Sequence, residues 1–265
     1  MINTSIVACG QSFDIGCRVV LWNEEEGLSF YPKKSFFSRN VSLNELQREI
    51  TCFVLHHSVT YTAHSTFRGL LGRNLSVNFI IDDDVNQDTG AATIYQCADI
   101  KEACWSHGEL NRRGAGVEIS YHPEAWQNAG LYSKANIEKN GVQPHDVIKD
   151  QVFGVARNVF APTEAQIKAC IRLMYGYCKL FPYVRPEFPK DKNGKIERGI
   201  VTSPKGLLLH ANFNPQKADP LGLPLDRVEK EVQELVKTVV KPGMKQFAAK
   251  TLSKLLYRFK VLQQG

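Results

Sequence analysis

Two short apolar segments, each closed by a histidine, constrain the fold of this chain more than any other feature. Residues 52–55 run into His56, and residues 207–209 run into His210. Apolar runs of this length, bounded by polar residues, are typical of buried strands. Because a histidine at the end of such a strand lies at the rim of a sheet, we expect both imidazoles where metal and substrate sites are commonly built.

A carboxylate completes a candidate metal site. Asp219 follows His210 closely and precedes Pro220. Two histidines and one carboxylate form a catalytic zinc site that leaves one coordination position for water. Each residue also has a simpler explanation, because histidines at strand ends are more often structural and an aspartate often caps a helix. Taken together, His56, His210 and Asp219 predict a zinc hydrolase. Adjacent strand residues point to opposite faces, so His57 is not expected to reach the metal.

Two further residues have the chemistry that a hydrolase needs. Glu118 stands in the mostly apolar segment 115–121, and a buried carboxylate is costly unless it is paired or functional. Beside the metal it is suited to take a proton from water and deliver it to a leaving amine. Lys217 is suited to donate to an oxyanion. The alternatives are a solvent-facing glutamate and a solvated loop lysine. His107 and Asn78 are candidates for lining a substrate groove.

The remaining patterns predict a mixed sheet flanked by helices. Ser42 and Thr163 each begin a capping box, and each predicts the start of a helix. The polar segment 122–160 is interpreted as an insertion of loops, and Asn193-Gly194 as a hairpin turn before the strand that ends in His210. Because strands do not alternate regularly with long helices, a mixed sheet is favoured over a doubly wound parallel one. We expect further strands at residues 17–22, 77–82, 92–97 and 115–121, the middle two forming a hairpin, and further helices at 66–71 and 224–240.

The net charge of +6 is concentrated near the end of the sequence. Seven basic residues and no acidic ones follow Glu234, and without these seven charges the rest of the chain is nearly neutral. A nucleic-acid footprint over the whole fold is therefore not expected. From Met244 to Leu262, apolar residues recur at helical spacing among the lysines. They predict a basic amphipathic helix, which either packs on the body or binds an anionic envelope or membrane surface.

The cysteines and the first residues indicate the compartment in which the chain folds. None of the seven cysteines forms a C-x-x-C pair, so buried reduced thiols explain them better than disulfides or a cysteine-rich zinc site. The sequence begins without the basic region and long apolar core of a secretory signal. We therefore expect synthesis in the cytoplasm without a signal peptide.

The chain resembles the zinc-dependent N-acetylmuramoyl-L-alanine amidases of the type-2 amidase and peptidoglycan-recognition superfamily. The resemblance rests on segments that occur in family order: 53–58, 77–82, 94–96, 105–108, 116–120 and 210–220. It implies that His56, His210 and Asp219 hold Zn²⁺, that Glu118 is the general base and acid, and that Lys217 stabilises the oxyanion. The implied reaction is hydrolysis of the amide between N-acetylmuramic acid and L-alanine in peptidoglycan.

The residue patterns and the extent of the resemblance together divide the chain into three parts. We expect an amino-terminal β-rich extension at residues 1–41, the zinc amidase domain at 42–240, and the basic helix at 241–265.

A lytic role, as in a bacteriophage endolysin, places the activity at the bacterial cell wall (the periplasm). The alternatives are a cytoplasmic amidase that recycles muropeptides, a peptidoglycan-binding module without activity, and a virion structural protein. The sequence leaves the stem-peptide preference and the oligomeric state open.

Overall fold

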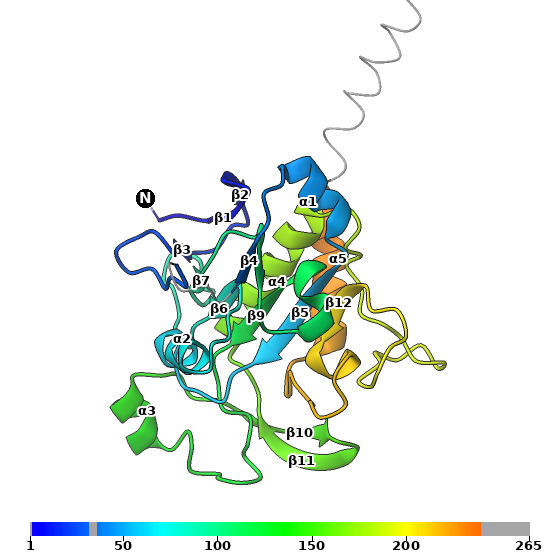
Figure 1. Ribbon diagram of the computed structural model, residues 1–265. Coiled ribbons are helices and arrows are strands. Elements are labelled where there is room, and N and C mark those ends of the chain that lie inside the picture. Colours follow the sequence, from blue (N-terminus) through cyan, green and yellow to red (C-terminus); the bar gives the residue numbers. More distant parts are fainter. Residues whose placement is uncertain (1, 32–35, 240–265) are drawn as a thin grey trace, which may run out of the picture.

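A six-stranded mixed sheet forms the centre of the molecule, in a computed structural model that describes residues 2–31 and 36–239 (Figure 1). The strand order is β12-β5-β9-β6-β7-β3. Neighbouring strands are parallel except for β6 and β7, which form the predicted antiparallel pair. The strands are β3 (Val19–Leu21), β5 (Cys52–His57), β6 (Phe79–Ile81), β7 (Ile94–Gln96), β9 (Gly114–Ile119) and β12 (Gly206–Leu209). The mixed sheet predicted from the sequence is confirmed.

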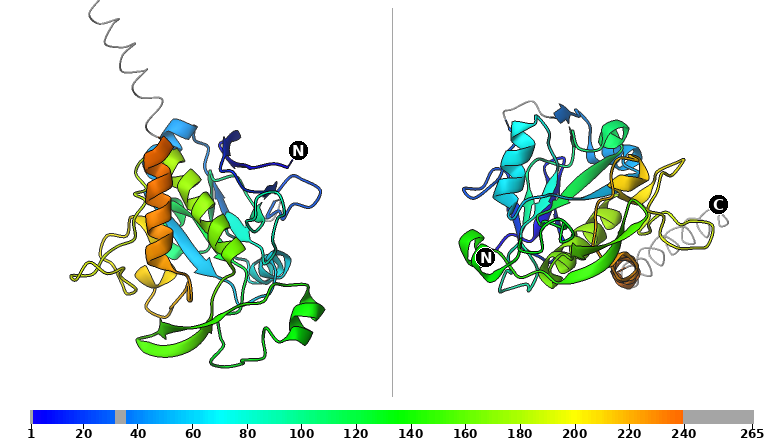
Figure 2. Two further views of the ribbon diagram at one scale, coloured as in Figure 1. Left: turned by 180° about the vertical axis from the view of Figure 1, so that it is seen from behind. Right: turned by 90° about the horizontal axis from the view of Figure 1, so that it is seen from below.

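Five α-helices of the described residues surround this sheet: α1 (Leu43–Glu49), α2 (Ala63–Gly72), α3 (Lys134–Asn140), α4 (Glu164–Leu180) and α5 (Leu225–Val239). Helices α4 and α5 lie side by side behind the sheet (Figure 2). Their buried side chains share one core with Phe53 and Leu55 of β5. On the other face, α2 packs against Ile80 of β6. Both faces of the sheet are therefore covered, which explains why its strands read as continuous apolar runs.

Local sequence signals set the helix starts. Ser42 accepts a hydrogen bond from the backbone N–H of Glu45, and the Glu45 carboxylate accepts one from the Ser42 backbone. The equivalent reciprocal pair joins Thr163 and Gln166 at the start of α4. Both predicted capping boxes are confirmed. All seven cysteines are free, and all but the partly buried Cys9 are buried. No helix among the described residues combines the length and apolar character needed to cross a membrane.

The amino-terminal segment forms three short pairings. Strands β1 (Ser5–Ala8) and β2 (Gln11–Asp14) make a hairpin, and β4 (Phe36–Ser38) pairs with β8 (Glu102–Cys104). Strand β3 joins the edge of the central sheet beside β7. The division of the chain into three parts at residues 41 and 240 stays a prediction. The expected basic helix at 241–265 lies outside the described residues.

The prediction of loops for residues 122–160 was wrong. This segment contains α3 and a hairpin of β10 (Val147–Val152) and β11 (Val155–Phe160), joined by Phe153 and Gly154. Helix α3 has no buried residue, and most positions of the hairpin are exposed. Because few positions of the hairpin are buried, its strands need no regular alternation of apolar and polar residues, and periodicity gave no signal here.

The turn at Asn193-Gly194 was predicted only in part. Gly194 adopts a positive φ of 78°, as a tight turn requires. The turn is closed by a single antiparallel bridge between Lys190 and Ile196, and no strand is assigned on either side of it. Strand β12 pairs in parallel with β5 and not with this turn.

Candidate active site

The parallel register of three neighbouring strands brings the candidate residues together. His56 of β5 lies directly beside Glu118 of β9. Leu209, the last residue of β12, pairs with Leu55, so that His210 follows at the level of His56. Leu55 and Leu209 pack in the core shared with α4. Because side chains alternate along a strand, His56 and His210 are directed to the opposite face of the sheet.

The ligand atoms of His56, His210 and Asp219 form a compact triangle. The two Nδ1 atoms are 2.9 Å apart, and Asp219 Oδ2 lies 3.0 Å from the His210 Nδ1 and 3.3 Å from the His56 Nδ1. Within the described ranges, this is the one group of three or more side chains with the geometry of a metal site. Tetrahedral ligands at zinc distances are about 3.3 Å from one another. The triangle therefore fits a zinc ion.

The protonation states of these residues suit metal binding. Burial lowers the pKa of His56 below its usual value, despite the hydrogen bond to Asp219. Burial alone would raise the pKa of Asp219, but hydrogen bonds from His210 and His56 bring it well below the usual range. A neutral imidazole and an ionised carboxylate are the forms that coordinate a metal. His56 and Asp219 are therefore in the forms that coordinate a divalent cation near neutral pH.

Glu118 stands beside this triangle with its proton affinity raised. Its carboxylate is partly buried, and Oε2 has no hydrogen-bond partner among the described residues. Burial, and then the negative charge of Asp219, raise the pKa of Glu118 to about 8. Arg73 and Lys217 oppose this increase. A carboxylate with a pKa near the working pH is able both to take and to give a proton.

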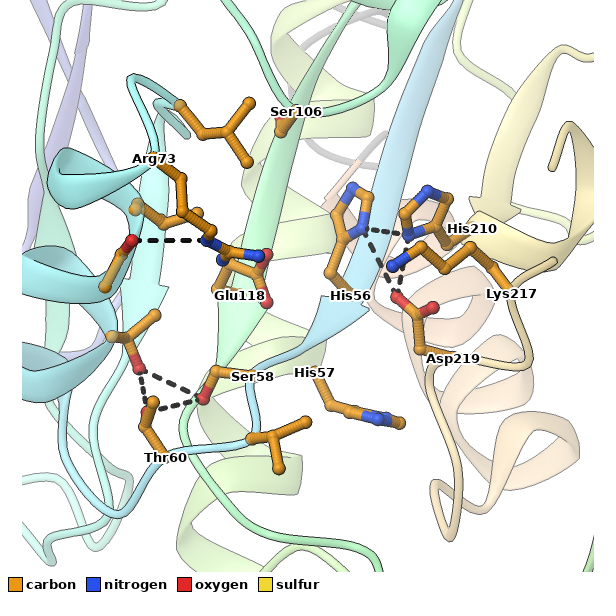
Figure 3. A pocket seen from close by; sticks show the side chains of 15 residues that line it. His56, His57, Ser58, Thr60, Arg73, Ser106, Glu118, His210, Lys217 and Asp219 are labelled. Carbon is orange, nitrogen blue, oxygen red and sulfur yellow. Dashed lines mark hydrogen bonds and ion pairs between the residues drawn. The ribbon is translucent and has the colours of Figure 1, made fainter.

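Lys217 and Arg73 place positive charge in the same pocket. Figure 3 shows Glu118 and Lys217 to either side of His56, with the Lys217 side chain next to His210 and Asp219. Arg73 reaches toward Glu118 from the end of α2, where it is the C-cap residue. Its Nε donates to the Gly69 carbonyl oxygen at 3.2 Å. The sequence analysis did not identify Arg73, because only the packing of α2 on the sheet brings it to the site.

A cluster of hydroxyl groups forms the floor of the pocket near α2. Thr60 Oγ1 lies 2.8 Å from Ser58 Oγ and 2.6 Å from Thr66 Oγ1, which also contacts the Ser120 hydroxyl at 3.0 Å. The pocket has a volume of about 470 Å³, and Ser58, Thr60 and Thr66 all line it together with the ligand triangle. This volume is within the range of ligand sites. Single serines and threonines carry no sequence signal for such a role.

His107 and Asn78, expected to line a substrate groove, do not line this pocket. Both are buried. The His107 ring stacks on His56 with 6.1 Å between ring centroids, and its Nδ1 lies 2.7 Å from Ser106 Oγ. Asn78 donates to the Glu102 carbonyl oxygen at 3.1 Å. His107 therefore supports His56 from behind, whereas Asn78, directly before β6, joins this strand to β8 away from the pocket. The sequence pattern does not show that the packing of the sheet encloses both positions.

His57 is kept apart from the ligand triangle, as the alternation of strand residues predicts. Its Nδ1 accepts a hydrogen bond from the Leu221 backbone at 3.0 Å, and its ring packs against Tyr121. Burial lowers the pKa of His57 to about 4. His57 therefore holds the loop after Asp219 in place as a neutral residue.

Comparison with known proteins identifies one matching family. The sequence matches the Amidase_2 family, described as N-acetylmuramoyl-L-alanine amidase, over residues 46–221. No curated protein matches the sequence at a significant level. The matched segment contains His56, Glu118, His210, Lys217 and Asp219, five of the residues that line the pocket.

Three solved structures are similar at low sequence identity. The N-acetylmuramyl-L-alanine amidase AmiD from E. coli is 14% identical with a TM-score of 0.45, and the match covers 86% of this chain and 65% of AmiD. The endolysin amidase LysCS from Clostridium intestinale is 10% identical with a TM-score of 0.44, covering 82% and 95%. The hydrolase AmiA from Staphylococcus aureus is 13% identical with a TM-score of 0.46, covering 83% and 84%. This chain therefore spans less than two thirds of the AmiD structure.

Proposed function

This chain belongs to the N-acetylmuramoyl-L-alanine amidase family, and we propose that it is a zinc-dependent enzyme that cleaves the amide between N-acetylmuramic acid and L-alanine. The observation that carries this proposal is the triangle of His56, His210 and Asp219 with Glu118 beside it. A binding module without activity has no need of a carboxylate whose pKa is raised to about 8 next to such a triangle.

The residues of the pocket suit the two proton transfers of amide hydrolysis. His56, His210 and Asp219 would hold the zinc, which would supply a Lewis acid for the scissile carbonyl and a lowered pKa for bound water. Glu118 takes the proton of the attacking water and then delivers it to the nitrogen of the leaving L-alanine. Lys217 donates to the carbonyl oxygen as negative charge develops on it.

Mass spectrometry of digested peptidoglycan tests the reaction directly. Purified wall is incubated with the protein and zinc, and the soluble products are compared with those of Glu118→Gln. We expect free stem peptides that begin with L-alanine from the wild type only. Intact muramoyl peptides in both digests would contradict the proposal, and binding to wall without cleavage would indicate the peptidoglycan-binding alternative.

We also propose that the natural substrate is intact wall, so that the protein acts as a lytic enzyme at the bacterial cell wall. The basic sequence at residues 241–265 supports this, because repeated lysines favour association with an anionic envelope. A muropeptide-recycling enzyme has no such requirement. Comparison of intact sacculi with soluble muropeptides separates the two roles, since a recycling enzyme cuts only the soluble fragments.

The contribution of the basic segment is measured by deleting residues 243–265. The shortened protein is expected to keep its thermal stability and its activity on soluble muropeptides, and to lose binding to anionic vesicles. If stability falls while vesicle binding is unchanged, the segment packs on the body and does not bind a surface.

A further inference from the structure

A second cavity adjoins the active site on the side of Lys217. It has a volume of about 500 Å³ and lies between the β10–β11 hairpin, the loop at residues 191–200 and the segment that carries Lys217. Lys217 lines both cavities. In Figure 1 the hairpin lies below the ends of β5 and β9, which are the strands that carry His56 and Glu118. The two cavities are therefore neighbours, with Lys217 in the wall of each.

One carboxylate connects the walls of this cavity to one another. Asp150 of β10 accepts a hydrogen bond from the Gly222 backbone at 2.7 Å and forms an ion pair with Arg198 at 3.3 Å. It thereby connects the hairpin to the loop that follows Asp219 and to the loop at 191–200. A cavity whose walls are fixed before binding loses less conformational entropy when a ligand enters.

Phe153 at the tip of the hairpin is the least expected residue of the cavity. The two-residue turn Phe153-Gly154 has positive φ at both positions, 50° and 78°, where glycine, asparagine and aspartate are preferred. A bulky aromatic residue is disfavoured in this conformation. Its side chain is 64% exposed, so burial in the core does not offset this cost. A strained, exposed aromatic residue that lines a cavity points to a role in binding.

The other residues of the cavity add an apolar surface and hydrogen-bond donors. Ile200 is 56% exposed and lines the cavity with Phe153. Lys195 and Lys217 also line it, and neither forms an ion pair with a described residue. A sugar ring presents apolar C–H faces surrounded by hydroxyl and acetyl oxygens. An exposed aromatic ring beside flexible donors is complementary to such a group.

The direction of the substrate follows from the proposed catalytic roles. Glu118 protonates the leaving nitrogen, so the stem peptide leaves toward Glu118 and Arg73. Lys217 lies on the other side of His56 and also lines the second cavity (Figure 3). The acyl half extends from the scissile carbon away from the nitrogen, which places it on this side of the pocket. The acyl half carries the sugar. We infer that the cavity between the β10–β11 hairpin and residues 191–200 binds the muramoyl sugar of the glycan strand, an inference that rests on the proposed function.

Two substrates that share one amide test this inference. A muramoyl peptide and the matching D-lactoyl peptide contain the same scissile bond, with and without the sugar. Phe153→Asn removes the ring, and asparagine tolerates the left-handed conformation, so the thermal midpoint should not fall. We expect KM for the muramoyl peptide to rise about fivefold, with kcat unchanged and the lactoyl peptide unaffected. Tyr183→Ala is the control, because Tyr183 is 59% exposed and lines neither cavity.

Every other outcome would reject the assignment of this cavity to the muramoyl sugar. Equal losses on both substrates would mean that Phe153 serves the general structure of the site. A loss that depends on the length of the stem peptide would assign the cavity to the peptide, and unchanged KM for both would mean that it binds neither. If the wild type cuts no substrate, the proposed function fails. Calorimetry with the free disaccharide GlcNAc-MurNAc then still tests the cavity, and only weaker binding to Phe153→Asn than to the wild type supports it.

Discussion

Replacement of Glu118 by glutamine should stabilise the metal-free protein while it removes catalysis. The carboxyl group has a pKa of about 8 in the fold against 4.5 for an unperturbed glutamate, chiefly because of burial. Between these two values the folded protein binds more protons than the unfolded chain. The free energy of unfolding therefore decreases as the pH rises from 4.5 toward 8. Glutamine keeps the shape of the side chain and has no such dependence.

The size of this effect follows from the two pKa values. Each pH unit between them lowers the free energy of unfolding by about 1.4 kcal/mol, which amounts to about 3 kcal/mol at pH 7. Because Glu118 is only partly buried, water screens part of this cost. We therefore expect Glu118→Gln to raise the free energy of unfolding by about 2 kcal/mol at pH 7. For a chain of this size, that corresponds to an increase of about 4–8 °C in the thermal midpoint.

Thermal unfolding in the presence of a chelator, at several pH values from 5 to 8, measures this difference. The stability of Glu118→Gln relative to the wild type should increase with pH, and zinc should reduce the difference because positive charge favours the carboxylate. Glu24→Gln, at an exposed position, controls for the loss of one charge. A difference that does not change with pH, or a variant less stable than the wild type at pH 8, would refute the reasoning.

Four further changes test other parts of the site and fold. Removal of zinc by a chelator should abolish activity and lower the free energy of unfolding. Zinc added back at 100 times its Kd should restore about 2.7 kcal/mol of that free energy. An unchanged melting curve would count against a bound metal. Asp219→Asn should lower the zinc content measured by mass spectrometry. Lys217→Met should reduce kcat by about 10²–10³-fold with an unchanged zinc content. Thr163→Ala removes the capping box of α4 and should cost about 1 kcal/mol without a change in kcat.

The two histidine ligands could be found from the sequence because each follows an apolar run that ends at the same edge of the sheet. The runs before His56 and His210 form adjacent parallel strands, so that their ends meet without a long connection. Glu118 was recognisable because a carboxylate interrupts an otherwise buried strand. In each case the signal lies within a few residues of sequence, and the parallel pairing of the strands brings these residues together in one site.

The remaining residues depend on contacts that no local pattern records. Arg73 reaches Glu118 from the end of a helix, and the hydroxyl group of Thr66 meets that of Ser120 across 54 residues of chain. His107 was expected to line the groove, but its ring lies buried behind His56. The hairpin that carries Phe153 was missed because it buries too little surface to need an apolar pattern.

The two carboxylates of the site are shifted in opposite directions, and this assigns their roles. Asp219 accepts hydrogen bonds from two imidazoles, which overcome the effect of burial and keep it ionised. Glu118 has an oxygen without a partner and experiences the negative charge of Asp219, so that burial dominates and its pKa rises to about 8. The ionised group is suited to hold a cation and the protonatable group to move a proton. The negative charge that allows Asp219 to act as a ligand is thus one of the causes that allow Glu118 to act as an acid.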